Sequence, residues 1–251
     1  MPLVTPARAS LREPLIAFAT TTLLAAGFGA LGAAVPLVRD NLSLLIAIVF
    51  FLAPLVVAMR AGREPEFDYR EVGLRADPVG LNLRVLGVMV LLSFPAFVIG
   101  FFLFYGRTCA GGIEVLSHWF APMCGRWLGY ARGHLHLPDK FALLAASYLI
   151  VTAIPEEVFF RGYLMERLER VWPPARVVFG AKVGWALVVS SALFAVSHVA
   201  VIPNPQRLAV FFPALLFGWM RARTGSIAAG AVFHALCNLL SDVLHTSYFW
   251  R

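Results

Sequence analysis

Seven apolar runs divide this chain of 251 residues and constrain its fold more than any other feature. We place them at residues 14–35, 42–59, 85–105, 141–166, 183–200, 208–220 and 227–245. An apolar run of about 20 residues is long enough to cross the hydrocarbon core of a bilayer as a helix. Because 60% of the residues are hydrophobic and 14% are charged, we predict an all-α, polytopic membrane bundle of about seven transmembrane helices, within a range of six to eight.

The basic residues predict how the chain is oriented. The net charge of +7 comes from 19 arginines and two lysines, and such an excess is typical of cytoplasmic loops, so nucleic-acid binding is not needed to explain it. Assigning successive segments to alternate sides puts fourteen basic residues on one side and seven on the other. This predicts a multi-pass protein with a cytoplasmic N-terminus. The preference for arginine suits a GC-rich bacterial genome, and hence a bacterial cytoplasmic (inner) membrane.

We find no internal repeat or interdomain linker, so residues 1–251 are predicted to form a single membrane domain. The first apolar run is longer than a signal-peptide core and is interpreted as a retained signal anchor. We expect residues 60–84 to be a solvated cytoplasmic loop, and residues 106–140 to contain aromatic, amphipathic stretches in the membrane interface. The histidines of this second loop are interpreted as solvated or interfacial rather than metal-bound: His118, His134 and His136.

The three cysteines, Cys109, Cys124 and Cys237, show no CxxC spacing, so a zinc or redox motif is not supported. Cys109 and Cys124 both fall in the long loop that the charge count puts outside. We hypothesise that they form a disulfide there. The alternative is two free, partly buried thiols, because sequence alone does not show whether their Cα atoms come within bonding range.

Two adjacent glutamates and an arginine, Glu156, Glu157 and Arg161, interrupt the fourth apolar run. Ionisable groups inside a membrane cost roughly 2.5 to 3.5 kcal/mol each on insertion scales, so they require pairing and suggest a function. Glu157 and Arg161 stand at the i, i+4 spacing at which side chains meet on a helix. Glu156 points about 100° away from Glu157 and stays available for chemistry. The alternative is a helix that ends at Pro155, followed by a wet, charged segment.

Polar side chains also recur at helical spacing in two later runs. Phe194 and His198 share one face of the fifth run, and His234 and Asn238 share one face of the seventh. By the helical rise, His234 lies about 11 Å and His198 about 22 Å from the inner ends of their helices. Glu156 reaches a comparable depth, about 15 to 20 Å, only if the fourth helix continues to Arg170. We therefore predict that it does.

A glutamate, two histidines and an asparagine at one buried point suit the hydrolysis of an amide. The carboxylate and an imidazole can activate a water, while His or Asn donors stabilise the oxyanion. His, His and Glu could instead hold a catalytic zinc. Two observations argue against zinc. The HExxH motif of many zinc proteases is absent from the sequence, and asparagine is a poor zinc ligand but a good hydrogen-bond donor.

The ordered motifs EExxxR, FxxxH and HxxxN on successive apolar helices resemble those of the CPBP family, the CAAX-processing and bacteriocin-processing intramembrane endopeptidases also called the Abi family. The resemblance covers residues 141–245, the expected catalytic core, and the segment 68–74 is similar to a loop of many bacterial members. It implies a metal-independent glutamic peptidase without a cofactor. The roles that it implies are Glu156 as the water-activating base, His198 as its partner, His234 and Asn238 as oxyanion donors, and Glu157, Arg161 and Phe194 as supporting residues.

The resemblance predicts an intramembrane endopeptidase that cleaves a membrane-anchored protein or peptide, and a C-terminal sorting signal is one candidate cleavage site. Two other functions are considered. A non-enzymatic immunity or scaffold protein could use the same fold, and an ion-coupled transporter could use intramembrane Glu and His as a relay. A complete set of base, partner and oxyanion donors favours the peptidase, and inverted repeats, which would favour a transporter, are not found.

Overall fold

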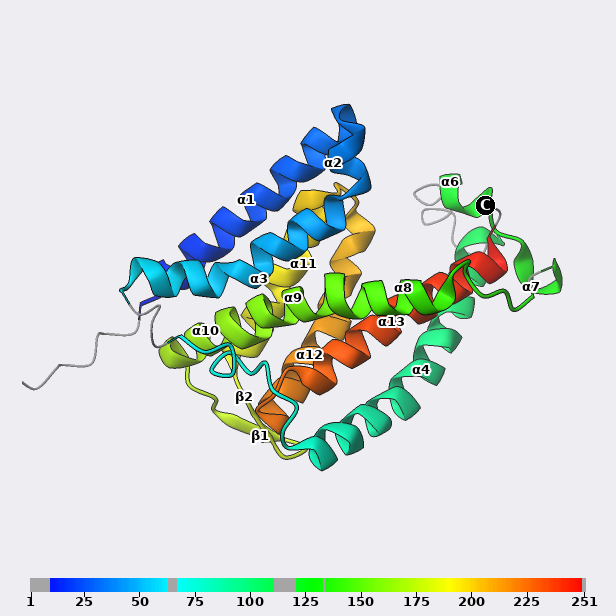
Figure 1. The fold of residues 1–251 in the computed structure, drawn as a ribbon. Coiled ribbons are helices and arrows are strands. Elements are labelled where there is room, and N and C mark those ends of the chain that lie inside the picture. The colour runs from blue at the N-terminus through cyan, green and yellow to red at the C-terminus, as the bar shows by residue number, and fades with distance from the viewer. Residues whose placement is uncertain (1–9, 63–66, 111–120, 133, 250–251) are drawn as a thin grey trace, which may run out of the picture.

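The structure is a computed structural model that describes residues 10–62, 67–110, 121–132 and 134–249. It is mostly helical, and Figure 1 shows long helices crossing one another at varied angles. The helices before the core are α1 (Arg12–Ala34), α2 (Pro36–Asp40), α3 (Leu42–Arg60), α4 (Val79–Cys109), α6 (Ala121–Cys124) and α7 (Gly129–Arg132). The core helices are α8 (Phe141–Ser147), η2 (Tyr148–Ala153), α9 (Ile154–Glu157), η3 (Val158–Leu164), α10 (Met165–Val171), α11 (Trp185–Val201), η4 (Pro205–Val210), α12 (Phe211–Thr224) and α13 (Ala228–Tyr248).

Each of the seven predicted spans corresponds to a helix in this structure. Four helices of the described chain are long and apolar enough to cross a membrane: α1, α3, α4 and the composite helix Phe141–Val171. The protein is therefore a multi-pass membrane protein. The helix α11 is apolar but has only 17 residues, α12 has 14 residues, and α13 carries Asp242 and two histidines in its 21 residues. Length and hydropathy alone therefore do not assign α11, α12 and α13 as membrane-spanning helices.

A short β-hairpin corrects the all-α prediction. Strands β1 (Arg176–Val178) and β2 (Ala181–Val183) pair antiparallel, with Arg176 opposite Val183. The two turn residues, Phe179 and Gly180, have φ angles of 48° and 78°, the positive values that a two-residue hairpin turn of this kind requires. Strands of three residues are too short for the alternation of apolar and polar residues to predict them.

The composite helix is the centre of the fold. It continues without a break from Phe141 to Val171, as the depth argument predicts, so the alternative of a helix ending at Pro155 is wrong. Figure 1 shows α13 lying side by side with α8 and running in the opposite direction. The helices α1 and α3 pack together, and α3 in turn contacts α9 and η3.

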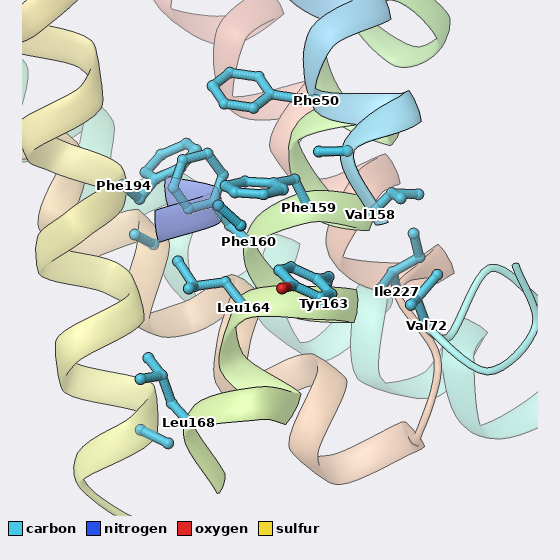
Figure 2. Close-up of a cluster of buried hydrophobic side chains, with 14 residues drawn as sticks. Phe50, Val72, Val158, Phe159, Phe160, Tyr163, Leu164, Leu168, Phe194 and Ile227 are labelled. Atoms are coloured by element: carbon cyan, nitrogen blue, oxygen red, sulfur yellow. The ribbon is translucent and has the colours of Figure 1, made fainter. Parts of the chain in front are cut away.

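An aromatic cluster surrounds the middle of the composite helix. In Figure 2, Phe159 and Phe160 lie on η3, and Phe194 reaches toward them from α11. The rings of Phe160 and Phe194 meet edge to face at 4.9 Å, a favoured aromatic geometry. Phe50 of α3 stacks on Phe159 at 5.3 Å. These contacts fix the rotation of the composite helix, and with it the directions of Glu156 and Glu157.

The loop between α3 and α4 is less solvated than predicted. Val72 is buried, and its carbonyl oxygen lies against Gly162 so closely that a Cβ there would overlap it. The Tyr69 hydroxyl donates to the carbonyl of Phe51 at 3.0 Å, and burial raises the pKa of Tyr69. The backbone N–H of Ile227 donates to the carbonyl of Gly73 at 2.9 Å. The loop therefore joins η3 to the start of α13.

The loop between α4 and α8 carries the disulfide. Cys109 and Cys124 are bonded, with Cα atoms 4.9 Å apart, so the hypothesis of a disulfide is confirmed in the structure and Cys237 is a free thiol. His118 and part of the expected amphipathic stretch lie outside the described residues. His134 and His136 are exposed, and the backbone N–H of His136 donates to Oγ of Ser247 at 2.8 Å.

Candidate active site

The site is built on a composite helix whose pitch changes around the two glutamates. The segments η2 and η3 are π-helical, and they flank the single α-helical turn that carries Glu156 and Glu157. Pro155 lacks the N–H that a helix residue donates to the carbonyl four positions earlier, and its ring crowds that carbonyl. Wider π-helical turns relieve such crowding and are frequent at functional sites. The two carboxylates are therefore presented from a widened stretch of helix.

Glu157 and Arg161 form the buried ion pair that their spacing predicts. Nη1 of Arg161 lies 3.1 Å from Oε1 of Glu157, and the two side chains are 1% and 0% exposed. The guanidinium also donates to the carbonyl of Ala214 at 3.3 Å. It lies over the rings of Phe194 and Phe217, at 4.2 and 5.2 Å from their centroids, a cation–π arrangement. Arg161 is thus held between a carboxylate and an aromatic wall.

His234 of α13 lies between the two glutamates. Its Nδ1 is 3.1 Å from Oε1 of Glu157, and its Nε2 is 3.8 Å from Oε2 of Glu156. The imidazole stacks on Phe217 with ring centroids 4.6 Å apart. Glu157 is a carboxylate in an ion pair with Arg161. It therefore accepts the hydrogen bond, and Nδ1 of His234 donates it. The other nitrogen of the ring then faces Glu156.

His198 is oriented by its own helix. Its Nδ1 lies 3.0 Å from the carbonyl oxygen of Phe194. A carbonyl only accepts, so Nδ1 carries the proton and Nε2 of the neutral ring is left as an acceptor. The rings of Phe194 and His198 are 4.4 Å apart. Phe194 therefore contacts both Arg161 and His198.

A cavity of about 970 Å³ brings three of the predicted site residues to one surface: Glu156, His198 and Asn238. Glu157 and Arg161 lie behind this surface, and His234, which is 4% exposed, separates Glu157 from Glu156. The remaining walls come from α3, α4, η2 and η4, through residues such as Phe50, Phe101, Tyr148 and Arg207. All these segments lie in the half of the bundle toward the C-terminal ends of α4 and α13. By the predicted orientation, this half faces away from the cytoplasm.

Oε2 of Glu156 is buried and has no hydrogen-bond partner among the described residues. A buried carboxylate oxygen without a donor is costly unless a water or a ligand satisfies it. The Glu156 side chain also lines the cavity, so its carboxylate group is placed to exchange a proton with a molecule bound there.

Sequence reasoning missed two features of the cavity wall. The Tyr148 hydroxyl donates to Oδ2 of Asp242 and so joins η2 to α13. Both residues continue stripes already identified, since Asp242 lies one turn beyond Asn238, and Tyr148 lies two turns before Glu156. The second feature is Arg207, on the 3₁₀-helix η4. Arg207 lies between the fifth and sixth apolar runs, where no periodic pattern of apolar residues could predict its place in the site.

Among the described residues, no three His, Cys, Asp or Glu side chains are grouped so that they could hold a metal ion. Asn238, which also lines the cavity, is a hydrogen-bond donor and a poor zinc ligand. The arrangement offers a carboxylate, imidazoles and an amide around one cavity. These groups can exchange a proton with a bound water and donate hydrogen bonds to a developing oxyanion.

Fold and site together define a polytopic helical membrane protein whose helices line a cavity that contains ionisable side chains. Residues 138–240 match the family described as type II CAAX prenyl endopeptidase Rce1-like, and this part of the chain is a domain of that family. The matched segment includes the EExxxR, FxxxH and HxxxN motifs. The match of this domain suggests a peptidase, and hence a protein substrate. No curated protein and no solved structure matches the chain.

Proposed function

We propose that the protein is an intramembrane endopeptidase, with Glu156 as the general base that activates water. The observation that carries this proposal is the carboxylate of Glu156 in the wall of a cavity shared with His198 and Asn238, where one of its oxygens has no hydrogen-bond partner among the described residues. A non-enzymatic scaffold has no need of a carboxylate in the wall of a cavity. A base needs it, because a proton must be accepted where the substrate binds.

In the proposed reaction, a water in the cavity loses a proton to Glu156 while its oxygen bonds to the peptide carbonyl carbon. The carbonyl electrons move to oxygen, and Asn238 donates a hydrogen bond to the resulting oxyanion. His234 assists through Nε2 when that nitrogen is protonated. His198, with Nε2 as its acceptor, orients the water. When the intermediate collapses, the C–N bond breaks and the proton held by Glu156 passes to the leaving nitrogen.

Glu157 and Arg161 have a positioning role in this proposal. Because Glu157 accepts from His234 and pairs with Arg161, it fixes the imidazole beside Glu156. Arg161 balances the negative charge of Glu157. No metal or organic cofactor takes part, and we place the protein in a bacterial inner membrane with its N-terminus in the cytoplasm. The substrate is a membrane-anchored protein or peptide, and one candidate cleavage site is a C-terminal sorting signal.

The test is the substitution Glu156→Gln, which keeps size and hydrogen bonding but removes the base. We expect cleavage to fall by roughly 10²- to 10⁴-fold, the usual contribution of a general base, while expression is unchanged. Terminal peptides of membrane proteins from cells with the wild-type or variant chain would be compared by mass spectrometry. The control is Glu71→Gln, at an exposed glutamate outside the cavity. Identical termini in wild-type and Glu156→Gln cells, or undiminished turnover of a substrate by the variant, would show that Glu156 is not the base.

A further inference from the structure

Arg207 is a cation of the cavity wall that the proposed reaction does not use. It lies on η4 beside Gln206, and both residues line the cavity that contains Glu156 and His198. Its side chain is partly buried. Within the described residues, the guanidinium has no ion-pair or hydrogen-bond partner. By contrast, Arg161 pairs with Glu157 at 3.1 Å, and the partly buried Arg221 lies 4.0 Å from Glu169.

The charge of Arg207 acts on the reactive groups. Its electrostatic interactions reach both Glu156 and His198. Partial burial lowers the pKa of the Arg207 guanidinium, with the negative charge of Glu156 opposing this change, but an arginine remains protonated in either case. A guanidinium partly removed from water and left unpaired attracts an anion strongly.

The opposite charge lies elsewhere in the same cavity. Asp242 of α13 lines the wall and accepts a hydrogen bond from Tyr148. Asp242 lies on α13 and Arg207 on η4, and no ion pair joins them among the described residues, so the two charges lie apart in the cavity. A bound anion is attracted to the region of Arg207 and repelled from that of Asp242. The cavity is therefore electrically polarised.

We propose that Arg207, with the amide of Gln206 beside it, binds a carboxylate of the substrate close to the bond that is cut. Guanidinium and carboxylate groups match in shape and form two parallel hydrogen bonds. The carboxylate has two sources: the side chain of an Asp or Glu near the scissile bond, or the C-terminal carboxylate of a substrate cut near its end. This proposal rests on the proposed endopeptidase function, since it assigns the substrate class of that same site.

The experiment measures binding separately from cleavage. Three fluorescent peptides of one apolar sequence serve as probes: one with Glu and an amidated C-terminus, one with Gln and a free C-terminus, and one with Gln and an amidated C-terminus. Their affinities for the detergent-solubilised Glu156→Gln protein are measured by fluorescence anisotropy. We expect a charged probe to bind roughly 10- to 100-fold more tightly than the neutral one, as for a charge-assisted hydrogen-bond pair. Tighter binding of the Glu probe would identify a side-chain carboxylate as the ligand, and tighter binding of the probe with a free C-terminus would identify the C-terminal carboxylate.

Arg207→Gln in the same background should abolish this preference and leave the affinity for the neutral probe unchanged, which also shows that the variant folds. The matched control is Arg126→Gln, at an exposed arginine outside the cavity wall. It should retain the preference. Equal affinities for the three probes, including the absence of binding by all of them, would overturn the proposal, as would a preference that survives Arg207→Gln.

Cleavage of the same peptides by the wild-type chain distinguishes the two proposals. If cleavage depends on Glu156 while the three probes bind equally, the carboxylate site is wrong and the endopeptidase function stands. If the Arg207-dependent preference is present but no peptide or cellular protein is cut, the function is wrong and the carboxylate site stands.

Discussion

The Nδ1 atom of His234 lies 3.1 Å from Oε1 of Glu157, and this contact joins two helices at the centre of the protein. The same carboxylate oxygen lies 3.1 Å from Nη1 of Arg161. One glutamate therefore fixes both a histidine of α13 and an arginine one turn along its own helix. Its neighbour Glu156 is left facing the cavity, so adjacent and chemically identical side chains have different surroundings.

Glu157→Gln should destabilise the fold by about 3–5 kcal/mol, the usual cost of removing one partner of a buried ion pair. The reason is that Arg161 would remain charged among aromatic rings without a carboxylate. The measurement is the free energy of unfolding in mixed micelles. Glu166→Gln is the control, because its pair with Arg170 at 2.6 Å is much less buried, with the two side chains 27% and 54% exposed, and should contribute about 0–1 kcal/mol. Equal losses in the two variants would contradict the importance of burial, and Glu157→Gln/Arg161→Met should recover part of the stability.

Gly162→Ala should lower stability by about 1–3 kcal/mol, the typical cost of overpacking. A Cβ at this position meets the backbone carbonyl of Val72, and a backbone atom cannot move aside as the end of a side chain can. The matched control is Gly87→Ala in α4, where a Cβ meets nothing within 4 Å. There the helix propensity of alanine should leave stability unchanged or raise it by about 0.5–1 kcal/mol. Thermal unfolding of both variants in detergent tests this, and an unaffected Gly162→Ala protein would contradict the close packing of the loop on η3.

The disulfide provides a test of stability and of topology. It closes a separation of 15 residues, so Cys109→Ser/Cys124→Ser should lose about 3 kcal/mol by the loop-entropy estimate. An impermeant thiol reagent applied to intact cells should label Cys109 and Cys124 only after reduction. Cys237, which is partly buried in α13, should stay protected. Full labelling without reduction would contradict the disulfide, and labelling only after the inner membrane is opened would reverse the predicted orientation.

Exhaustive chelation should leave the peptidase activity unchanged, because the proposed mechanism uses a carboxylate and hydrogen-bond donors rather than a metal-bound water. Activity would be measured before and after dialysis against a chelator, together with elemental analysis of the purified protein. Magnesium and calcium added back separately serve as controls for nonspecific ionic effects. Activity that disappears on chelation and returns with zinc would favour the His/His/Glu zinc alternative.

Local spacing predicted the features that depend on one helix. The i, i+4 positions of Glu157 and Arg161 predicted their pair, and the need for a common depth predicted that the helix continues past Pro155 to Arg170; in the structure it ends at Val171. Seven apolar runs predicted the positions of seven helices because burial in a membrane requires long apolar stretches. The hairpin at Arg176–Val183 was missed because its strands are too short to show a period.

The sequence by itself determined the helices, the motifs and the membrane environment, since each depends on residues close together in the chain. Helical spacing predicted that Glu156 stays available, but only the tertiary structure decided that Glu156 lines the cavity and that Glu157 meets Nδ1 of His234. That choice depends on the rotation of the composite helix, set by its π-helical turns and by aromatic contacts from α3 and α11. Arg207 likewise becomes part of the site only when η4 folds against the cavity. Such contacts join segments that are distant in the chain. Their geometry depends on how side chains pack together, which the periodic pattern of residues within one helix does not reveal.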